Sequence, residues 1–306
     1  GPYSSRYSTT CQKTLEKQQS FLMSADLHLH STYSDGTLEP QEIVEHADSI
    51  GLRTLALTDH DTINGWGDMK RQCQSANISW VPGIELSTSH AGQEIHVLGY
   101  FPDDILSVIP EKLEAFQARR RKRICDIIIR LRDAGINWDV DQVIDSINCQ
   151  SPGRPHVARA LVKHGVVSNV SNAFRKYLCK DKPGWVPSTY PSATEMIQTI
   201  HSDRGLAVLA HPGLGVSNEV ITDLASQGLD GVEVYHTSHK PSLVRKYRYL
   251  ADKFKLVVTG GSDCHGHISG GIRMGKVVLS NEDTMCFLKR LGMSSSFRPS
   301  TTSASH

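Results

Sequence analysis

The sequence predicts an α/β fold in which mostly parallel strands are joined by helical crossovers, either as a barrel or as a doubly wound sheet. Two observations support this prediction: seven short apolar runs recur along the chain, and helical stretches follow them. A third observation adds an insert, because helices follow one another without convincing strands between residues 103 and 187. With 306 residues, the chain is long enough for one large domain with a buried core.

The predicted strands are short, apolar and rich in Leu, Ile and Val. They lie at residues 25–27, 54–57, 80–84, 95–98, 206–209, 231–235 and 256–259, and a late run at 276–279 is a candidate for an extra strand. Two intervening helices carry signals at their ends. The helix at 38–51 has Pro40 in its first turn and a terminal glycine, and the helix at 219–228 also stops at a glycine.

The helical insertion domain is predicted at residues 103–187. An apolar stripe at helical spacing ends at Gly135, and shorter helices are expected at 157–164 and 172–179. The barrel would then comprise residues 23–102 and 188–292. Residues 1–22 are expected to be a disordered leader or tag remnant, and residues 293–306 a disordered Ser/Thr-rich tail.

The overall composition excludes several classes of protein. The formal net charge is +1, which argues against a general polyanion binder, and no apolar run approaches the roughly 20 residues of a membrane span. The seven cysteines are scattered, with no CxxC pair, so we expect a reducing compartment and a cytoplasmic protein. The basic residues of the leader are also compatible with import into an organelle. Nothing in the sequence predicts a membrane or protein partner.

Nine side chains of the metal-ligating type lie in or just after predicted strands. They are His28, His30, Asp35, His60, Glu85, His96, His211, Asp263 and His265. The carboxyl ends of parallel strands face one side, so these side chains should converge there. A single histidine in such a place is usually a hydrogen-bonded structural residue, but nine ligands together suit two or three ions. Mixed nitrogen and oxygen ligands favour Mn²⁺, Zn²⁺ or Fe²⁺ over Ca²⁺ or Mg²⁺.

These residues resemble the four-motif signature of the PHP (polymerase and histidinol phosphatase) family of phosphoesterases. The matching motifs are Asp26-Leu-His-Leu-His30, Leu-Thr-Asp-His60, Gly-Ile-Glu85, His96, Ala-His211-Pro and Gly-Ser-Asp263-Cys-His265. The segment from Pro152 to Arg159 is similar to the branch that includes RNase AM and nucleotide phosphatases. The resemblance implies a distorted (β/α)7 TIM-like barrel with a helical insertion domain and a site for three metals.

The resemblance also implies an allocation of ligands. His28, His30, Glu85 and Asp263 would hold the first metal. Glu85 would bridge to a second metal, also held by His96 and His211, while Asp35, His60 and His265 would hold the third. Asp26 and Asp59 are expected to orient histidine rings by accepting hydrogen bonds from the ring N–H groups that do not face a metal. Asp263 and Glu85 would be catalytic through the metals they hold, and His239 is a candidate proton donor to the leaving oxygen.

A site with several divalent ions and three carboxylates is net positive, which favours a phosphate ester as substrate. Arg154, His156 and Lys182 are the predicted phosphate contacts outside the metals. Arg154 precedes a proline that fits the first turn of a helix, where N–H groups also attract anions. A surface arginine beside a helix cap and a solvated lysine are the alternatives. The basic run at 119–123 is either a solvated helix face or a contact for an RNA backbone.

The predicted function is a metal-dependent phosphoesterase acting on nucleotides, either 5′-mononucleotides or 3′,5′-bisphosphates. Trimming of short 5′-phosphorylated RNA in the 5′ to 3′ direction is part of the same prediction, so the partners would be a nucleotide, a short oligonucleotide or RNA. One alternative is a small-metabolite phosphatase, such as one for histidinol phosphate. A second alternative is a non-catalytic RNA-binding protein that keeps the metals for its structure.

Overall fold

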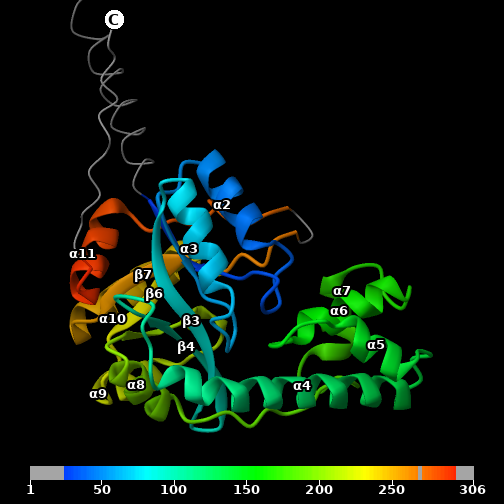
Figure 1. Ribbon diagram of the computed structural model, residues 1–306. Helices are drawn as coiled ribbons and strands as arrows, with labels where there is room; N and C mark the ends of the chain where they lie inside the picture. Colours follow the sequence, from blue (N-terminus) through cyan, green and yellow to red (C-terminus); the bar gives the residue numbers. More distant parts are fainter. Residues whose placement is uncertain (1–23, 268–270, 294–306) are drawn as a thin grey trace, which may run out of the picture.

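Seven strands form one sheet in chain order, and the sheet closes on itself. The computed structural model describes residues 24–267 and 271–293, so the predicted leader at 1–22 and, apart from Met293, the predicted tail lie outside the described residues. The strands are β1 (Ala25–Leu29), β2 (Thr54–Leu57), β3 (Ser79–His90), β4 (Gln93–Tyr100), β5 (Leu206–Leu209), β6 (Gly231–His236) and β7 (Val257–Gly261). A bridge between Leu29 and Cys264 joins β1 to the segment after β7. The distorted TIM-like barrel is confirmed (Figure 1).

The strand β4 runs against both of its neighbours, whereas the other neighbouring strands are parallel. Only Ala91 and Gly92 connect β3 to β4, and both have positive φ angles. A two-residue loop joins antiparallel strands only, so a parallel β4 is impossible here. Glu85 consequently lies inside a long β3 rather than at its end. The late run at 276–279 is not a strand, because only Leu279 pairs, in an isolated bridge with Ala25.

Helices cover the outside of the barrel (Figure 1). They are α2 (Pro40–Ser49), α3 (Trp66–Ser75), α8 (Ala193–Ser202), α9 (Asn218–Ser226), α10 (Pro241–Phe254) and α11 (Asn281–Leu291). Strands β1, β2 and β5 are buried along their whole length, as expected for parallel strands covered on the outside and filled within. Within the described ranges, no helix combines the length and apolar character that crossing a membrane requires.

A second set of helices projects from the barrel between β4 and α8. It comprises α4 (Ile109–Asp133), α5 (Val140–Ser146), α6 (Arg154–Lys163), α7 (Val170–Ala173) and a π-helical turn, Phe174–Leu178. Leu113 and Phe116 in the first half of α4 pack in the barrel core, whereas Ile127, Ile128 and Leu131 pack in a separate apolar cluster with α6. The long helix α4 therefore connects two cores and carries the remaining helices away from the barrel (Figure 1).

The beginning of α4 is held by one buried carboxylate. Asp203 follows α8, is 3% exposed, and accepts hydrogen bonds from the backbone N–H groups of Ser107, Val108 and Ile109 at 2.7 to 3.1 Å. Burial alone would raise the pKa of Asp203, but these donors lower it below its usual value. Asp203 thus ties the projecting helix to the barrel through charge-assisted hydrogen bonds.

We expect Asp203→Asn to lower the free energy of unfolding by about 1 to 2 kcal/mol at pH 7. The pKa is lower in the folded chain, so this stability is present above the unfolded pKa of about 3.9 and is lost as the pH falls. Urea unfolding at pH 7 and pH 3 measures the effect. Asp104→Asn, which removes an exposed partner of Lys70, is the control. An equal gap between variant and wild type at both pH values would show that the charge contributes nothing.

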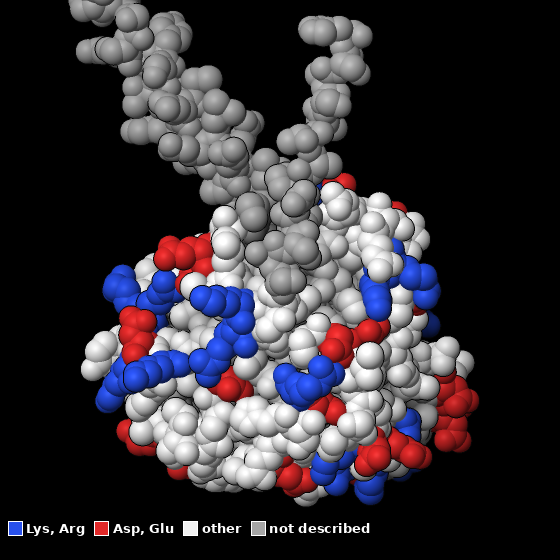
Figure 2. Space-filling model, turned by 60° about the vertical axis from the view of Figure 1, so that its left-hand side comes forward, with Lys and Arg blue, Asp and Glu red and all other residues white. Residues whose placement is uncertain are grey.

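The surface carries both signs of charge. On the face shown in Figure 2, Lys and Arg side chains lie among Asp and Glu side chains, in keeping with a net charge of +1. The six cysteines of the described residues are all free.

Candidate metal centre

The structure brings the predicted ligands together at one end of the barrel. Eight of the nine fall into three groups, in each of which the ligand atoms lie within 4.8 Å of one another. The groups are His28, His30, Glu85 and Asp263; then His30, Asp35, His60 and His265; then His60, Glu85 and His96. His211 belongs to none of these groups of described residues, but its Nε2 atom lies 2.9 Å from Glu85 Oε1.

Glu85 is the centre of the arrangement. Its Oε2 atom lies 3.0 Å from His28 Nε2 and 3.1 Å from His30 Nε2, and its Oε1 atom lies 2.8 Å from His96 Nδ1. Its two oxygens therefore face different sets of imidazoles. This is the geometry of a carboxylate that can bridge two ions, which is the role that the family resemblance implies for Glu85.

The group of His30, Asp35, His60 and His265 surrounds Asp35. Its Oδ1 atom lies 3.2 Å from His265 Nε2 and 3.8 Å from His30 Nδ1, and its Oδ2 atom lies 3.7 Å from His60 Nε2. Most of these separations exceed a hydrogen bond but suit ligands that each lie about 2 Å from a shared ion.

Several of these buried atoms lack hydrogen-bond partners, which tests whether the site fits a cation. Both ring nitrogens of His30, Nδ1 of His60 and Oδ1 of Asp35 are buried without a hydrogen bond of normal geometry. Leaving four such atoms unsatisfied is costly. Divalent ions would satisfy the lone pairs of Asp35 Oδ1, His60 Nδ1 and the unprotonated nitrogen of His30. The donor set of imidazoles and carboxylates also matches Mn²⁺, Zn²⁺ or Fe²⁺. The residues therefore fit the predicted metals.

The carboxylates of the site are held in their charged form by their neighbours. Burial raises the pKa of Asp35, Glu85 and Asp263, but the neighbouring imidazoles outweigh it and hold each pKa well below its usual range. Three negative charges thus lie within the ligand groups, and they are available to hold cations.

Strained backbone accompanies the ligands. His211 and Asp263 have φ angles of 26° and 51°, and Asp61, directly after His60, has a φ of 51°. Residues other than glycine adopt positive φ at a cost, and such positions concentrate at functional sites. Each of these residues lies shortly after a barrel strand. The strain therefore occurs where the chain leaves the strand and places its ligands at one end of the barrel.

Glu233 is a part of the site that the sequence analysis missed. It lies on β6 with no exposed surface, its Oε1 atom is 2.8 Å from His28 Nδ1, and its Oε2 atom accepts the backbone N–H of His211 at 2.7 Å. The sequence does contain a signal, since Glu233 is a carboxylate inside an otherwise apolar run. Nearby, His236 places Nε2 3.3 Å from Asp263 Oδ2.

The predicted orienting role of Asp26 and Asp59 is wrong. Asp26 accepts backbone N–H groups of His28 and Ser262, and Asp59 accepts hydrogen bonds from Ser31 and Ser34. Both carboxylates therefore fix the loops that carry the ligands. For His28, the carboxylate that holds the ring is Glu233.

We expect Glu233→Gln to weaken metal binding about 10- to 100-fold, because His28 loses the carboxylate that fixes its ring. The measurement is metal content by elemental analysis after dialysis against a series of chelator concentrations. Glu195→Gln, at an exposed ion pair with Lys112, is the control. Unchanged metal retention by Glu233→Gln would contradict the orienting role.

His239, the predicted proton donor, lies beside the site with both ring nitrogens engaged. Nδ1 is 2.8 Å from the carbonyl of Val234, and Nε2 accepts the N–H of Gly213 at 3.0 Å. Burial is the main reason that the pKa of His239 is lowered. Its role as a donor stays a prediction, and it would require one of these bonds to open.

A pocket of about 360 Å³ lies over the ligands. Asp35, His60, His96, Asp263 and His265 line it from the barrel, and Arg120, Arg123, Arg154 and Phe174 line it from the inserted helices. The pocket thus has a metal-ligating wall and a basic wall.

Two arginines of the basic wall have donors to spare. Arg154 lies over the rings of Phe174 and Trp185, at 5.7 and 5.5 Å, and makes a long hydrogen bond to the carbonyl of Leu178 at 3.4 Å. Arg123 also lies over Trp185, and its buried Nη2 atom has no hydrogen-bond partner. Aromatic rings fix both guanidinium groups, and an anion would satisfy their free N–H donors.

The other two predicted phosphate contacts are placed differently. Lys182 is exposed and is not among the described residues that line the pocket. His156 accepts the N–H of Gly153 through Nδ1, and burial, assisted by Arg159, lowers its pKa to about 4. His156 is therefore neutral at pH 7 and acts on the loop rather than as a cation.

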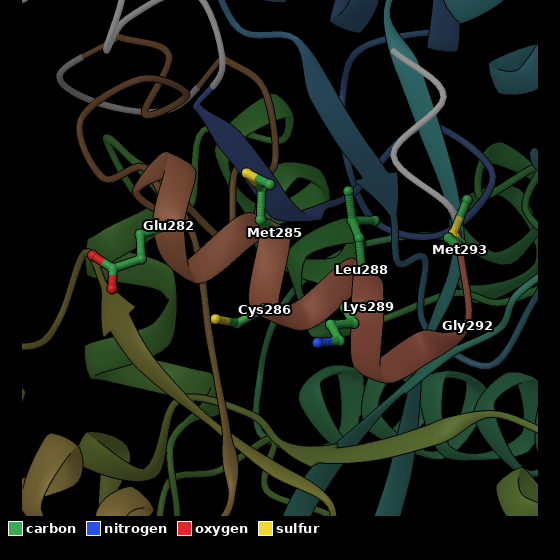
Figure 3. A pocket seen from close by; sticks show the side chains of 7 residues that line it. All are labelled: Glu282, Met285, Cys286, Leu288, Lys289, Gly292 and Met293. Carbon is green, nitrogen blue, oxygen red and sulfur yellow. The ribbon is translucent and has the colours of Figure 1, made fainter.

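A larger hollow of about 660 Å³ lies beside α11 (Figure 3). Its lining includes Met285, Leu288 and Met293, with Glu282 as the one carboxylate among the described lining residues. No histidine lines it within the described part of the chain. Size alone therefore does not identify the functional site, and the chemistry of the lining does.

Comparison with known proteins agrees with this geometry. Residues 26–185 match the PHP domain family. A 5′-3′ exoribonuclease of Haemophilus influenzae is 35% identical over 82% of this chain and 93% of its own length. A 3′,5′-nucleoside bisphosphate phosphatase of Chromobacterium violaceum is 33% identical over 82% of this chain and 90% of its own. The solved structure of a metal-dependent phosphoesterase from Bifidobacterium adolescentis has a TM-score of 0.79 at 29% identity, covering 87% and 96%.

Proposed function

Since this chain belongs to the PHP domain family, we propose that it hydrolyses nucleotides that carry a phosphate on each side of one ribose. The family makes it a hydrolase of phosphoester bonds. The observation that supports the narrower proposal is the pocket itself. Metal-ligating side chains line one wall, and two arginines with spare N–H donors line the other. Each wall can take one phosphate.

The barrel wall would hold the phosphate that is cleaved. Divalent ions, when bound there, would supply a water-derived nucleophile at neutral pH and neutralise the phosphoryl oxygens. Glu85 lies between two sets of imidazoles and contacts both. Asp35, Glu85 and Asp263 contribute three negative charges. Two or three divalent ions bring about four to six positive charges, so the wall stays attractive to an anionic ester.

The wall of inserted helices would hold the second phosphate. Arg154 and Arg123 offer fixed, planar donors, and a guanidinium group matches phosphate geometry well. A 3′,5′-bisphosphate and the first nucleotide of a 5′-phosphorylated RNA present the same pair of groups: a 5′-phosphate and a phosphoryl group on the 3′ oxygen. One pocket would therefore serve both the phosphatase and the exoribonuclease activities named for the relatives.

The test is a panel of substrates with Mn²⁺-loaded protein and a chelator-treated control. The panel contains a nucleoside 3′,5′-bisphosphate, a short 5′-phosphorylated RNA, the same RNA with a 5′-hydroxyl, AMP and histidinol phosphate. We expect the first two to be turned over at least about tenfold faster than the rest, because the others lack one of the two phosphates. Preference for histidinol phosphate would favour a small-metabolite phosphatase. RNA binding without turnover would favour a binding protein.

A further inference from the structure

One arginine of the basic run at 119–123 points inward. Arg119, Arg121 and Lys122 are exposed. Arg120 is only 7% exposed and is buried between α4 and the barrel. The run is therefore not one solvated face of the helix. Burying a guanidinium is costly unless it is paired and fully hydrogen-bonded, so its partners indicate its purpose.

The partners of Arg120 belong to three different segments. Its Nε atom lies 2.5 Å from Asp61 Oδ2, its Nη2 atom donates to Ser87 Oγ at 2.7 Å, and its Nη1 atom donates to the carbonyl of Pro152 at 3.3 Å. Asp61 directly follows His60, and Ser87 comes two residues after Glu85. One guanidinium thus contacts two segments that carry metal ligands and the loop that precedes Arg154.

Further hydrogen bonds reinforce this junction. Gln117, one turn before Arg120, donates to the carbonyl of Asp61 at 3.2 Å, and Ser151 donates to the carbonyl of His60 at 2.5 Å. Asp61 in turn donates its N–H to the carbonyl of Glu85 at 3.0 Å. The inserted segment therefore hydrogen-bonds directly to the His60–Asp61 turn, and Arg120 is the charged group among these contacts.

We propose that Arg120 is a positioning residue that sets the separation between the metal-ligating wall and the Arg154 loop, and so selects substrates with two phosphates. This inference rests on the proposed function. Its physical basis is the rigid fork of the guanidinium, which holds three acceptors in one plane, whereas a lysine ammonium on a flexible stem cannot. A shift of about 1 Å between the walls would leave one phosphate out of reach of its donors.

The test compares Arg120→Lys and Ser87→Ala with wild type on two substrates, a nucleoside 3′,5′-bisphosphate and p-nitrophenyl phosphate. Arg120→Lys keeps the buried charge, and Ser87→Ala removes one hydrogen bond while leaving the pair with Asp61 intact, so both should fold. For the bisphosphate we expect kcat/KM to fall about 10- to 100-fold in Arg120→Lys, mainly through KM, and about threefold in Ser87→Ala. For p-nitrophenyl phosphate both variants should stay within about threefold of wild type.

Metal content and the exposed variant Arg121→Lys serve as controls, and both should match wild type. If wild type prefers the bisphosphate but Arg120→Lys loses equally on both substrates, Arg120 is merely structural and this inference is wrong while the proposed function stands. If wild type shows no preference for the bisphosphate, the proposed function fails and the inference fails with it.

Discussion

Replacing Glu85 with glutamine should lower kcat about 10³-fold or more. The carboxylate faces five imidazoles, and its loss removes the charge that can be shared between two groups of metal ligands. Charge stabilisation by such ions is worth several kcal/mol, and each 1.36 kcal/mol corresponds to a factor of ten in rate. The measurement is single-turnover hydrolysis of a 3′,5′-bisphosphate at saturating Mn²⁺, with metal content determined on the same sample.

Glu94→Gln is a matched control for Glu85→Gln. Glu94 lines the same pocket, 3.5 Å from His96 Nε2, but it belongs to none of the three ligand groups among the described residues. We expect its effect to stay within about 10- to 100-fold, the range for a carboxylate that contacts a ligand ring from outside the ligand set, and so below the effect of Glu85→Gln. Full activity of Glu85→Gln with a normal metal content would contradict the bridging role of the Glu85 carboxylate.

Replacing Arg154 with methionine should lower kcat/KM for a 3′,5′-bisphosphate about 10- to 100-fold. Methionine keeps much of the packing against Phe174 and Trp185 but removes the charged donors. A hydrogen bond to a charged group contributes about 1.5 to 3 kcal/mol, which corresponds to that range. A phosphate ester without a second phosphate should lose less than about threefold, so the ratio of the two substrates is the measured quantity.

Lys182→Met tests whether Lys182 contacts phosphate, as the sequence predicts, or is only a solvated surface residue, as its position in the structure indicates. Both Arg154 and Lys182 are predicted phosphate contacts, but only Arg154 lines the pocket among the described residues. We expect Lys182→Met to leave both substrates unchanged, since an exposed lysine is solvated rather than aimed at the ligand. Equal losses in the two variants would mean that the loop carrying Lys182 reaches the substrate.

Local patterns in the sequence are sufficient to predict the strands and the convergence of the candidate ligands, and the family resemblance implies the barrel. Apolar runs of four or five residues mark the strands, and ligands that follow them must face one end of the barrel. The direction of β4 was the exception. Its signal was the two-residue connection at Ala91 and Gly92, which outweighs the general expectation of parallel strands.

Contacts between distant segments could not be predicted in this way. Glu233 meets His28 across 205 residues of sequence, and Arg120 meets Asp61 across 59. Sequence periodicity cannot show which of five consecutive cations turns inward, because that depends on a partner elsewhere in the chain. The position of Glu233 inside an apolar run signals a buried carboxylate, but the fold is needed to identify His28 as its partner.

The closure of the barrel between Leu29 and Cys264 also bears on how the protein is made. His28 emerges from the ribosome well before Asp263 and His265, because the other barrel strands lie between them in the sequence. A nascent chain therefore holds only an incomplete cage, and pairings so distant in sequence form slowly. The newborn polypeptide should stay inert towards nucleotides until its last barrel strand has been translated and has docked beside the first.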